Sequence, residues 1–255
     1  MTQAASVRSV DRALRILGAF EADRREVGVA ELAGLLGVHA STASRLAATL
    51  AAHGFLERDG RRDAFRLGPQ MIRLGLLAAG GESLVAAARP VMEKLAAETG
   101  ETVVLSVPSD HRAVDVAQVD SRYLVGGQSW VGRSLPLHAT SDGKVLLAWE
   151  AATLPPGALE RVTPSTITSR RQLERELAGA RAMGFAQAVG ECEPRLNGVA
   201  APIFAADGRC IAALSVSGPD YRLPATRIAE AGARCRAAAD EVSRRRGFGP
   251  NGDRP

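Results

Sequence analysis

The sequence feature that most constrains the fold is the stretch 29–54, which has the pattern of two short helices joined by a tight break. Leu32 and Leu36 lie on one face of the first helix, and Gly37 interrupts the periodicity. Gly54 stands where a C-terminal glycine cap is expected for the second helix. The apolar stripe of that helix comprises Val38, Ala43, Leu46, Ala47 and Leu50. This spacing predicts a helix-turn-helix.

The opposite face of the second helix is small and hydroxylated, with one arginine. Such side chains suit a close approach to the phosphate backbone and to base edges in the major groove. The residues that we expect to contact DNA from this helix are Ser41, Thr42, Ser44, Arg45 and Thr49. The same pattern also fits an ordinary helical hairpin packed into a core, so this stretch alone leaves both interpretations open.

A basic hairpin is predicted directly after these helices. Residues 55–58 and 61–67 have strand character and flank Asp59-Gly60, a dipeptide typical of tight hairpin turns. The hairpin carries four arginines, which core packing does not require, namely Arg58, Arg61, Arg62 and Arg66. The combination favours a winged helix-turn-helix, in which Arg58, Arg61 and Arg62 are expected DNA contacts.

A third helix is predicted ahead of the pair. Ser9 can cap a helix that runs through Phe20. Its apolar face would comprise Val10, Ala13, Leu14, Leu17 and Phe20. Arg8 and Arg12 lie at its start, where they either contact phosphate or form a solvated helix end.

Composition is that of a globular protein with one large or two modest domains. The chain has 255 residues, 46% hydrophobic residues and a formal net charge of +4. Residues 1–82 hold eleven arginines against nine acids, so charge gives little support for nucleic-acid binding. The three cysteines are widely spaced without a CxxC pair, which argues against a zinc site. No apolar run reaches about 18 residues, and we expect a cytoplasmic protein without a membrane segment.

The remainder of the chain alternates between helical and strand-like segments. Helices are expected at 69–79, 83–98, 140–149, 169–183 and 224–242. Strands are expected at 102–107, 113–119, 123–125, 185–189, 199–204 and 211–217. Antiparallel strands with helices outside predict an α+β fold. The predicted divisions are a winged helix-turn-helix domain at 1–68, a linker helix at 69–82, a second domain at 83–248 and a disordered tail at 249–255.

These residues resemble the IclR family of bacterial transcription regulators over nearly the whole chain. The N-terminal likeness lies in Ser9-Val10-Asp11-Arg12-Ala13-Leu14, Glu31-Leu32-Ala33, Ser41-Thr42 with Arg45-Leu46, and Gly54-Phe55-Leu56. The C-terminal likeness lies in Gly132-Arg133-Ser134-Leu135-Pro136-Leu137-His138-Ala139-Thr140, Gly143-Lys144, Arg161-Val162-Thr163, Thr166-Ile167-Thr168, Ala200-Ala201-Pro202 and Leu214-Ser215-Val216-Ser217-Gly218-Pro219. The ordered set is more specific than any one motif.

The resemblance implies a ligand-responsive regulator of a catabolic or metabolic operon. Its second domain would be GAF-like and would bind a small organic metabolite without a cofactor or metal. It would act as a dimer or tetramer on a palindromic double-stranded DNA operator. Carried over by position, the effector-binding residues would be Leu124, Gly127, Ser141, Asp142, Gly198, Ser215 and Ser217.

The charge of that effector stays open. A helix that begins near Thr140 favours an anion at its N-terminus, and Ser215 and Ser217 would aim two hydroxyls the same way. Asp142 places a negative charge where many relatives have a small apolar residue. An acidic effector would meet that charge unless Lys144 or Arg195 offsets it.

Two other functions are compatible with parts of the pattern. One is a small-molecule sensor or enzyme whose N-terminal helices serve dimerisation only, and the other is a regulator that needs no ligand. His138 lies near Ser141 and Asp142, but three residues crowded at one junction rarely form a catalytic triad. We therefore expect His138 to be a structural hydrogen-bonding group, with no catalytic residues in the chain.

Overall fold

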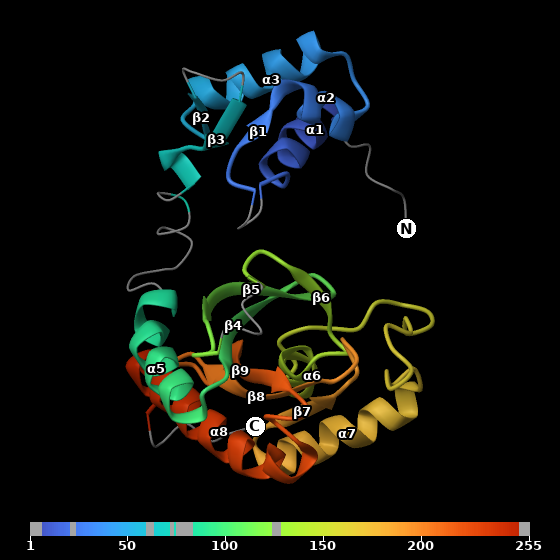
Figure 1. Cartoon of the computed structure of the whole chain (residues 1–255), viewed down its shortest axis with the longest axis vertical. Helices are drawn as coiled ribbons and strands as arrows, with labels where there is room; N and C mark the ends of the chain where they lie inside the picture. The colour runs from blue at the N-terminus through green and yellow to red at the C-terminus, as the bar shows by residue number, and fades with distance from the viewer. Residues whose placement is uncertain are drawn as a thin grey trace. The chain divides into compact units, whose positions relative to one another are not determined.

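The computed structural model describes residues 7–20, 24–59, 64–71, 74, 84–123 and 129–249 of the chain (Figure 1). The chain divides into two units, residues 1–83 and residues 84–255. None of the helices within the described ranges combines the length and the apolar character that a bilayer crossing requires.

The first unit packs three helices against a small antiparallel sheet. The helices are α1 (Arg8–Leu17), α2 (Val29–Leu36) and α3 (Ala40–Ala52). The strands β1 (Val27–Gly28), β2 (Leu56–Asp59) and β3 (Ala64–Leu67) pair in the order β1-β3-β2. The core of this unit includes Ile16, Leu32, Ala43, Ala47, Leu56 and Phe65. Strand β1 was not predicted, since two residues are too few to show an alternating pattern.

Glycines end α2 and α3 as predicted. Gly37 has a φ of 62°, and the N–H of Val38 donates to the carbonyl of Ala33 at 3.1 Å. Gly54 has a φ of 73°, and the N–H of Phe55 donates to the carbonyl of Leu50 at 2.9 Å. Both residues occupy the left-handed region that glycine adopts without a Cβ clash, so each helix stops sharply and turns the chain.

The predicted helix α1 is correct in existence but wrong in its cap and its buried face. It begins after Val7 without a side-chain cap and ends at Leu17, so Ser9 lies inside its first turn. The buried residue is Ile16, whereas Val10 and Leu14 are 55% and 62% exposed. Apolar residues occur all around this short helix, so periodicity alone could not identify the face that meets the core.

The hairpin of the first unit has a longer connection than predicted. Asp59 pairs with Ala64, which leaves residues 60–63 between the strands in place of a two-residue turn at Asp59-Gly60. Leu56 and Phe65 are both buried in the core, and this requirement fixes the register of the pair.

The second unit is an antiparallel sheet with helices on both faces. Its strands are β4 (Thr102–Ser109), β5 (Arg112–Val119), β6 (Ser134–Pro136), β7 (Ala186–Val189), β8 (Leu196–Phe204) and β9 (Cys210–Pro219). Their order is β6-β5-β4-β9-β8-β7, and every neighbouring pair is antiparallel. The helices are α5 (Leu84–Thr99), α6 (Ser141–Ala148), α7 (Arg170–Met183) and α8 (Ile228–Arg245), the last preceded by the 3₁₀ turn Ala225–Arg227. The predicted α+β fold is confirmed.

The two sheet faces have separate cores. Helices α5 and α8 lie side by side (Figure 1) and cover one face, where the core includes Leu95, Leu105, Leu214 and Val216. Helices α6 and α7 cover the other face, where smaller residues such as Ala113, Ala200 and Ala213 meet Val145 and Leu146. Alternation along β8 and β9 therefore sends neighbouring residues into different cores.

Three predicted details of this unit differ from the structure. Strand β6 was not expected. The strand expected at 123–125 is not formed at Tyr123, which lies in a bend, and residues 124–128 are outside the described ranges. The hairpin at Asp207-Gly208 has a connection of residues 205–209, closed by a hydrogen bond from Ala205 N–H to the Arg209 carbonyl.

Candidate nucleic-acid interface and effector cavity

Helix α3 separates a buried apolar face from an exposed polar face. Ala43 and Ala47 are fully buried, and Ser41, Arg45 and Thr49 on the other side are exposed. Thr42 and Ser44 are half-buried. The Thr49 hydroxyl donates to the Arg45 carbonyl at 2.9 Å, which holds this side chain along the helix. The predicted face of α3 is therefore available to a partner molecule.

The N-terminus of α3 is capped by a residue that the sequence did not single out. His39 is the N-cap, and its Nδ1 lies 3.4 Å from the Ser41 N–H and 3.0 Å from the Ser41 hydroxyl. Histidine is not among the residues usually preferred at this position, so no motif pointed to it. His39 is exposed beside Ser41 and joins the candidate DNA-facing residues.

The other predicted DNA contacts lie on α1 and the hairpin. Arg8 is exposed and Arg12 is half-buried on α1. Arg58 is exposed, and its guanidinium lies 5.8 Å from the Phe65 ring centroid. Arg66 pairs with Glu57 at 2.8 Å, so its charge is locally offset. Arg61 and Arg62 fall outside the described residues.

A cavity opens in the second unit between the sheet and the start of α6, with a volume of about 60 Å³. Five of the seven predicted effector-binding residues line it, namely Ser141, Asp142, Gly198, Ser215 and Ser217. The other two, Leu124 and Gly127, fall outside the described residues. The structure thus brings together every predicted cavity residue that it describes, from α6, β8 and β9.

The N-terminus of α6 is already occupied by acceptors from the protein itself. Thr140 is the N-cap and its Oγ1 accepts from the Gly143 N–H at 3.1 Å. Neighbouring donors, first the Ser106 hydroxyl and then the N–H of Asp142, the Thr140 hydroxyl and the N–H of Gly143, lower the pKa of the Asp142 carboxyl. Burial nevertheless raises the pKa of Asp142. The Ser141 side chain, which is 5% exposed, has no hydrogen bond with the described residues.

A second carboxyl, which the sequence analysis missed, faces the same cavity. Asp115 is 3% exposed and accepts a hydrogen bond from the Ser106 hydroxyl at 2.7 Å. Burial, followed by the neighbouring Asp142 carboxyl, raises the pKa of Asp115 to about 7. Two carboxyl groups therefore share one low-dielectric space, and at neutral pH protonation relieves part of their repulsion.

A β-bulge explains why Asp115 could not be placed from its sequence. Leu105 pairs with Ala117, but Ser106 pairs with Asp115, so Val116 is an extra residue in β5. Simple alternation would put Asp115 on the same side as Ala117, which packs with α5 and α8. The bulge turns Asp115 to the opposite side, into the cavity.

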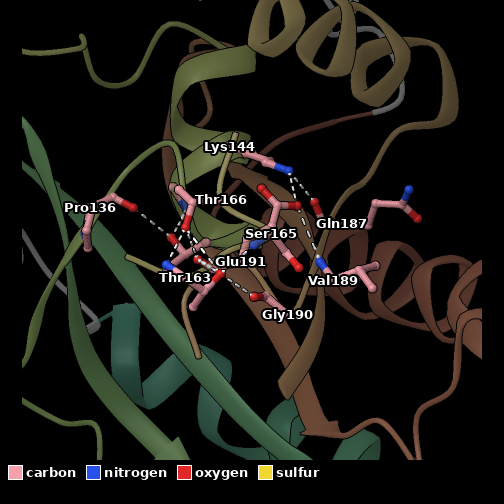
Figure 2. A network of polar contacts seen from close by, with 11 residues as sticks. Pro136, Lys144, Thr163, Ser165, Thr166, Gln187, Val189, Gly190 and Glu191 are labelled. Carbon is pink, nitrogen blue, oxygen red and sulfur yellow. Dashed lines mark hydrogen bonds and ion pairs between the residues drawn. The ribbon is translucent and has the colours of Figure 1, made fainter. Parts of the chain in front are cut away.

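The basic residues expected to offset Asp142 are paired elsewhere. Lys144 Nζ lies 2.7 Å from Glu191 Oε1 and donates to the Gln187 carbonyl at 2.9 Å (Figure 2). Arg195 pairs with Asp220 at 3.2 Å on the surface. Its φ of 64° is a conformation better suited to glycine.

Two threonines of the C-terminal signature hold the loop beside the cavity. Thr163 Oγ1 donates to the Gly190 carbonyl and Thr166 Oγ1 to the Glu191 carbonyl, each at 2.7 Å (Figure 2). Both threonines are buried. With Lys144 they fix residues 190–191, and the next residue, Cys192, lines the cavity. Signature residues outside the cavity thus set the position of its wall.

His138 has the structural role expected of it. It is 4% exposed, and its Nε2 lies 2.8 Å from the Glu160 carbonyl. The imidazole ring is therefore hydrogen-bonded to a backbone carbonyl and not to Ser141 or Asp142.

Known proteins resemble both units of the chain. The family model for the IclR helix-turn-helix domain matches residues 9–60, and that for the bacterial transcriptional regulator IclR C-terminal domain matches residues 78–244. The chain is 32% identical to the transcriptional repressor IclR of Escherichia coli over 93% of its length and 89% of the relative. It is 32% identical to the transcriptional regulator KdgR of the same organism, with 94% of each covered.

A solved relative shows the same architecture. An IclR homolog from Microbacterium hydrocarbonoxydans in complex with 4-hydroxybenzoate superposes with a TM-score of 0.79, at 28% identity, over 93% of this chain and 98% of that chain. Both family models describe domains of transcription regulators. On the combined evidence of both domain models and these full-length relatives, the chain belongs to the IclR family of bacterial transcriptional regulators.

Proposed function

We propose that residues 1–68 bind a palindromic DNA operator within a dimer or a pair of dimers, with α3 in the major groove. The observation that carries this proposal is the division of α3 into a buried face at Ala43 and Ala47 and an exposed face at Ser41, Arg45 and Thr49. A recognition helix needs that division, because one face holds it to its domain while the other meets base edges.

The arginines flanking α3 supply phosphate contacts in this proposal. Arg8, Arg12 and Arg58 project from α1 and the hairpin, and Arg61 and Arg62 would extend the same basic wing. Thr42 and Ser44, half-buried on α3, would approach the backbone closely. Phosphate contacts release counterions, so operator affinity should fall steeply as salt rises.

We further propose that the cavity of the second unit binds a small organic metabolite. Support comes from the confined, partly polar space at the start of α6 and from the relative whose solved structure contains 4-hydroxybenzoate. Residues 69–82 would act as the helical linker that couples the two domains. The chain would act in the cytoplasm and control a catabolic or metabolic operon, with a coupling between the sites of about 1 to 3 kcal/mol.

A gel-shift titration of the full chain tests the regulator proposal. The probe is the DNA upstream of its own coding sequence, with a shuffled duplex of the same composition beside it. We expect a sequence-dependent complex that weakens at least tenfold between about 50 and 200 mM salt. If neither duplex forms a salt-sensitive complex, the N-terminal helices serve dimerisation only and the proposal is wrong.

A further inference from the structure

The charged side chains that line the cavity of the second unit are acidic. Its wall includes Asp115 and Asp142, and no lysine, arginine or histidine among the described residues lines it. Among the residues that the structure describes, a ligand in this space therefore meets two carboxyl groups and no side-chain cation.

Three basic side chains outside the lining make contacts with other groups of the protein. Lys144 is held by Glu191, and Arg112 donates to the Ser134 carbonyl at 2.6 Å. Arg133 lowers the pKa of Asp115, and its guanidinium lies 4.9 Å from the Trp130 ring centroid. None of the three belongs to the residues that line the cavity.

The helix N-terminus, which could otherwise attract an anion, is not free to do so. The Thr140 hydroxyl accepts from the Gly143 N–H at 3.1 Å, and the acidic Asp142 lies in the first turn of the helix. A ligand carboxylate at this helix end would therefore meet an acidic side chain of the protein.

A buried polar group beside these acids has no partner of its own. The Ser141 side chain lines the cavity, is 5% exposed and makes no hydrogen bond with any residue in the described ranges. A Cβ built on Gly198 across the cavity would lie 3.0 Å from its Oγ, so this hydroxyl points into the space between α6 and β8. The hydroxyl is therefore available to hydrogen-bond to a ligand in the cavity.

We propose that the effector is a small organic cation, a primary ammonium or guanidinium compound, whose N–H groups donate to Asp115 and Asp142. This inference rests on the proposed effector role of the cavity. The Ser141 hydroxyl accepts a further N–H or bonds to a neighbouring polar atom of the ligand. An aliphatic or aromatic body packs against the apolar part of the wall, formed by Val104, Trp130 and Leu135.

Electrostatics in the empty cavity favour such a ligand. Burial and, secondarily, Asp142 hold the pKa of Asp115 near 7, and burial followed by Asp142 raises the pKa of the lining Cys192 thiol to about 11. A negative potential of this kind is relieved either by a proton or by an organic cation. Cation binding would therefore displace a proton from the carboxyl pair.

The test uses two series of three compounds that are similar in size and differ in charge. Ethanolamine, ethylene glycol and glycolate form one series, and benzylamine, benzyl alcohol and benzoate form the other. Each is titrated into the full chain while Tm is measured, and calorimetric titrations in two buffers of different ionisation enthalpy report proton exchange. We expect the amines to raise Tm by about 2 °C or more at saturation, with proton release, and the carboxylates to have no effect.

Variants assign the response to the cavity. D142N and D115N should weaken amine binding at least tenfold, whereas E174Q, which neutralises an exposed carboxyl on α7 outside the lining, should leave it unchanged. Stabilisation of the wild-type chain by carboxylates, an equal response to all members of a series, or no response to any compound would overturn the inference. The proton-release measurement needs no variant, so it decides the matter even if D142N fails to fold.

The outcome is separable from that of the regulator proposal. A chain that binds amines but forms no salt-sensitive DNA complex would retain this inference and lose the DNA-binding role. A chain that binds its operator but prefers carboxylates would retain the DNA-binding role and lose the inference of a cationic effector.

Discussion

Lys144 and Glu191 form a buried ion pair, with Nζ and Oε1 2.7 Å apart and side chains only 2% and 8% exposed (Figure 2). Glu191 Oε2 has no partner among the described residues, so the pair is incompletely satisfied. Burial raises the pKa of Glu191, and the opposing charge of Lys144 lowers it. The pair joins α6 to the loop after β7, and so connects the start of the cavity helix to the cavity wall.

Replacing one member of this pair should be more harmful than replacing both. We expect K144M to lower the free energy of unfolding by about 3 kcal/mol, because it leaves Glu191 buried without a cation. The double variant K144M/E191L should recover most of that loss. Urea unfolding followed by circular dichroism measures both. A control on the exposed pair Arg209–Asp207, R209A, should change stability by less than about 0.5 kcal/mol.

Stability should fall as pH rises toward and through neutrality because of Asp115. Its pKa is about 7 in the folded chain against an ordinary value of 3.8, so the folded state binds more protons than the unfolded state between these values. The stability is greatest below about pH 4 for this group alone and is lost by the time pH exceeds 7. The size of the loss is on the order of 4 kcal/mol.

The variant D115N isolates this contribution. Unfolding free energies at pH 5 and pH 8 should differ less in D115N than in the wild-type chain, because the amide does not titrate. An unchanged pH dependence in D115N would show that other groups dominate. E174Q again provides the matched control, since it removes a carboxyl that is exposed on α7.

Two glycines in helices should respond oppositely to alanine. A Cβ at Gly143 would lie 2.5 Å from the Leu137 Cα, so G143A should destabilise by about 1 to 3 kcal/mol and disturb the start of α6. A Cβ at Gly34 in α2 has nothing within 4 Å, so G34A should stabilise by up to about 1 kcal/mol. Thermal unfolding of the two variants side by side tests both signs.

Arg45 should distinguish base readout from phosphate contact. R45A should weaken operator binding by about 1 to 3 kcal/mol, or roughly 5- to 150-fold, if the guanidinium reads a base edge. Its effect on a shuffled duplex should then be much smaller. Equal losses on both duplexes would assign Arg45 to the phosphate backbone. R175A, which removes an exposed arginine from α7 in the second unit, should alter neither affinity.

Elements with a strong local signal were predictable from sequence. The helix-turn-helix was predicted from Gly37, Gly54 and the alanines of α3. The two ends of α7 were predicted from the Ser169 cap and Gly184. Each of these signals depends on neighbours within about one or two helical turns. The face of α1 was not predictable, because Ile16 competes with Val10 and Leu14 on a ten-residue helix and only tertiary packing decides among them.

Features of the cavity that depend on distant partners were only partly predictable. The lining residues Ser141, Ser215 and Ser217 followed from family likeness and strand alternation. Lys144 and Glu191, which form the buried ion pair, are 47 residues apart in the sequence, so no local sequence pattern predicted their contact. Nor did the hydrogen bonds from Thr163 and Thr166 to the loop at 190–191, although the motifs that contain them were recognised.

The extra residue at Val116 determines on which side of the sheet the carboxyl at 115 emerges. If β5 paired without this irregularity, the carboxyl of Asp115 would enter the apolar core beside Leu105 and Leu214. It would then lose its hydrogen bond from the Ser106 hydroxyl. The position of this acid in the cavity therefore depends on backbone register as well as on side-chain identity. A change of one residue in the length of β5 would move the carboxyl to the other face of the sheet without altering any other residue of the lining.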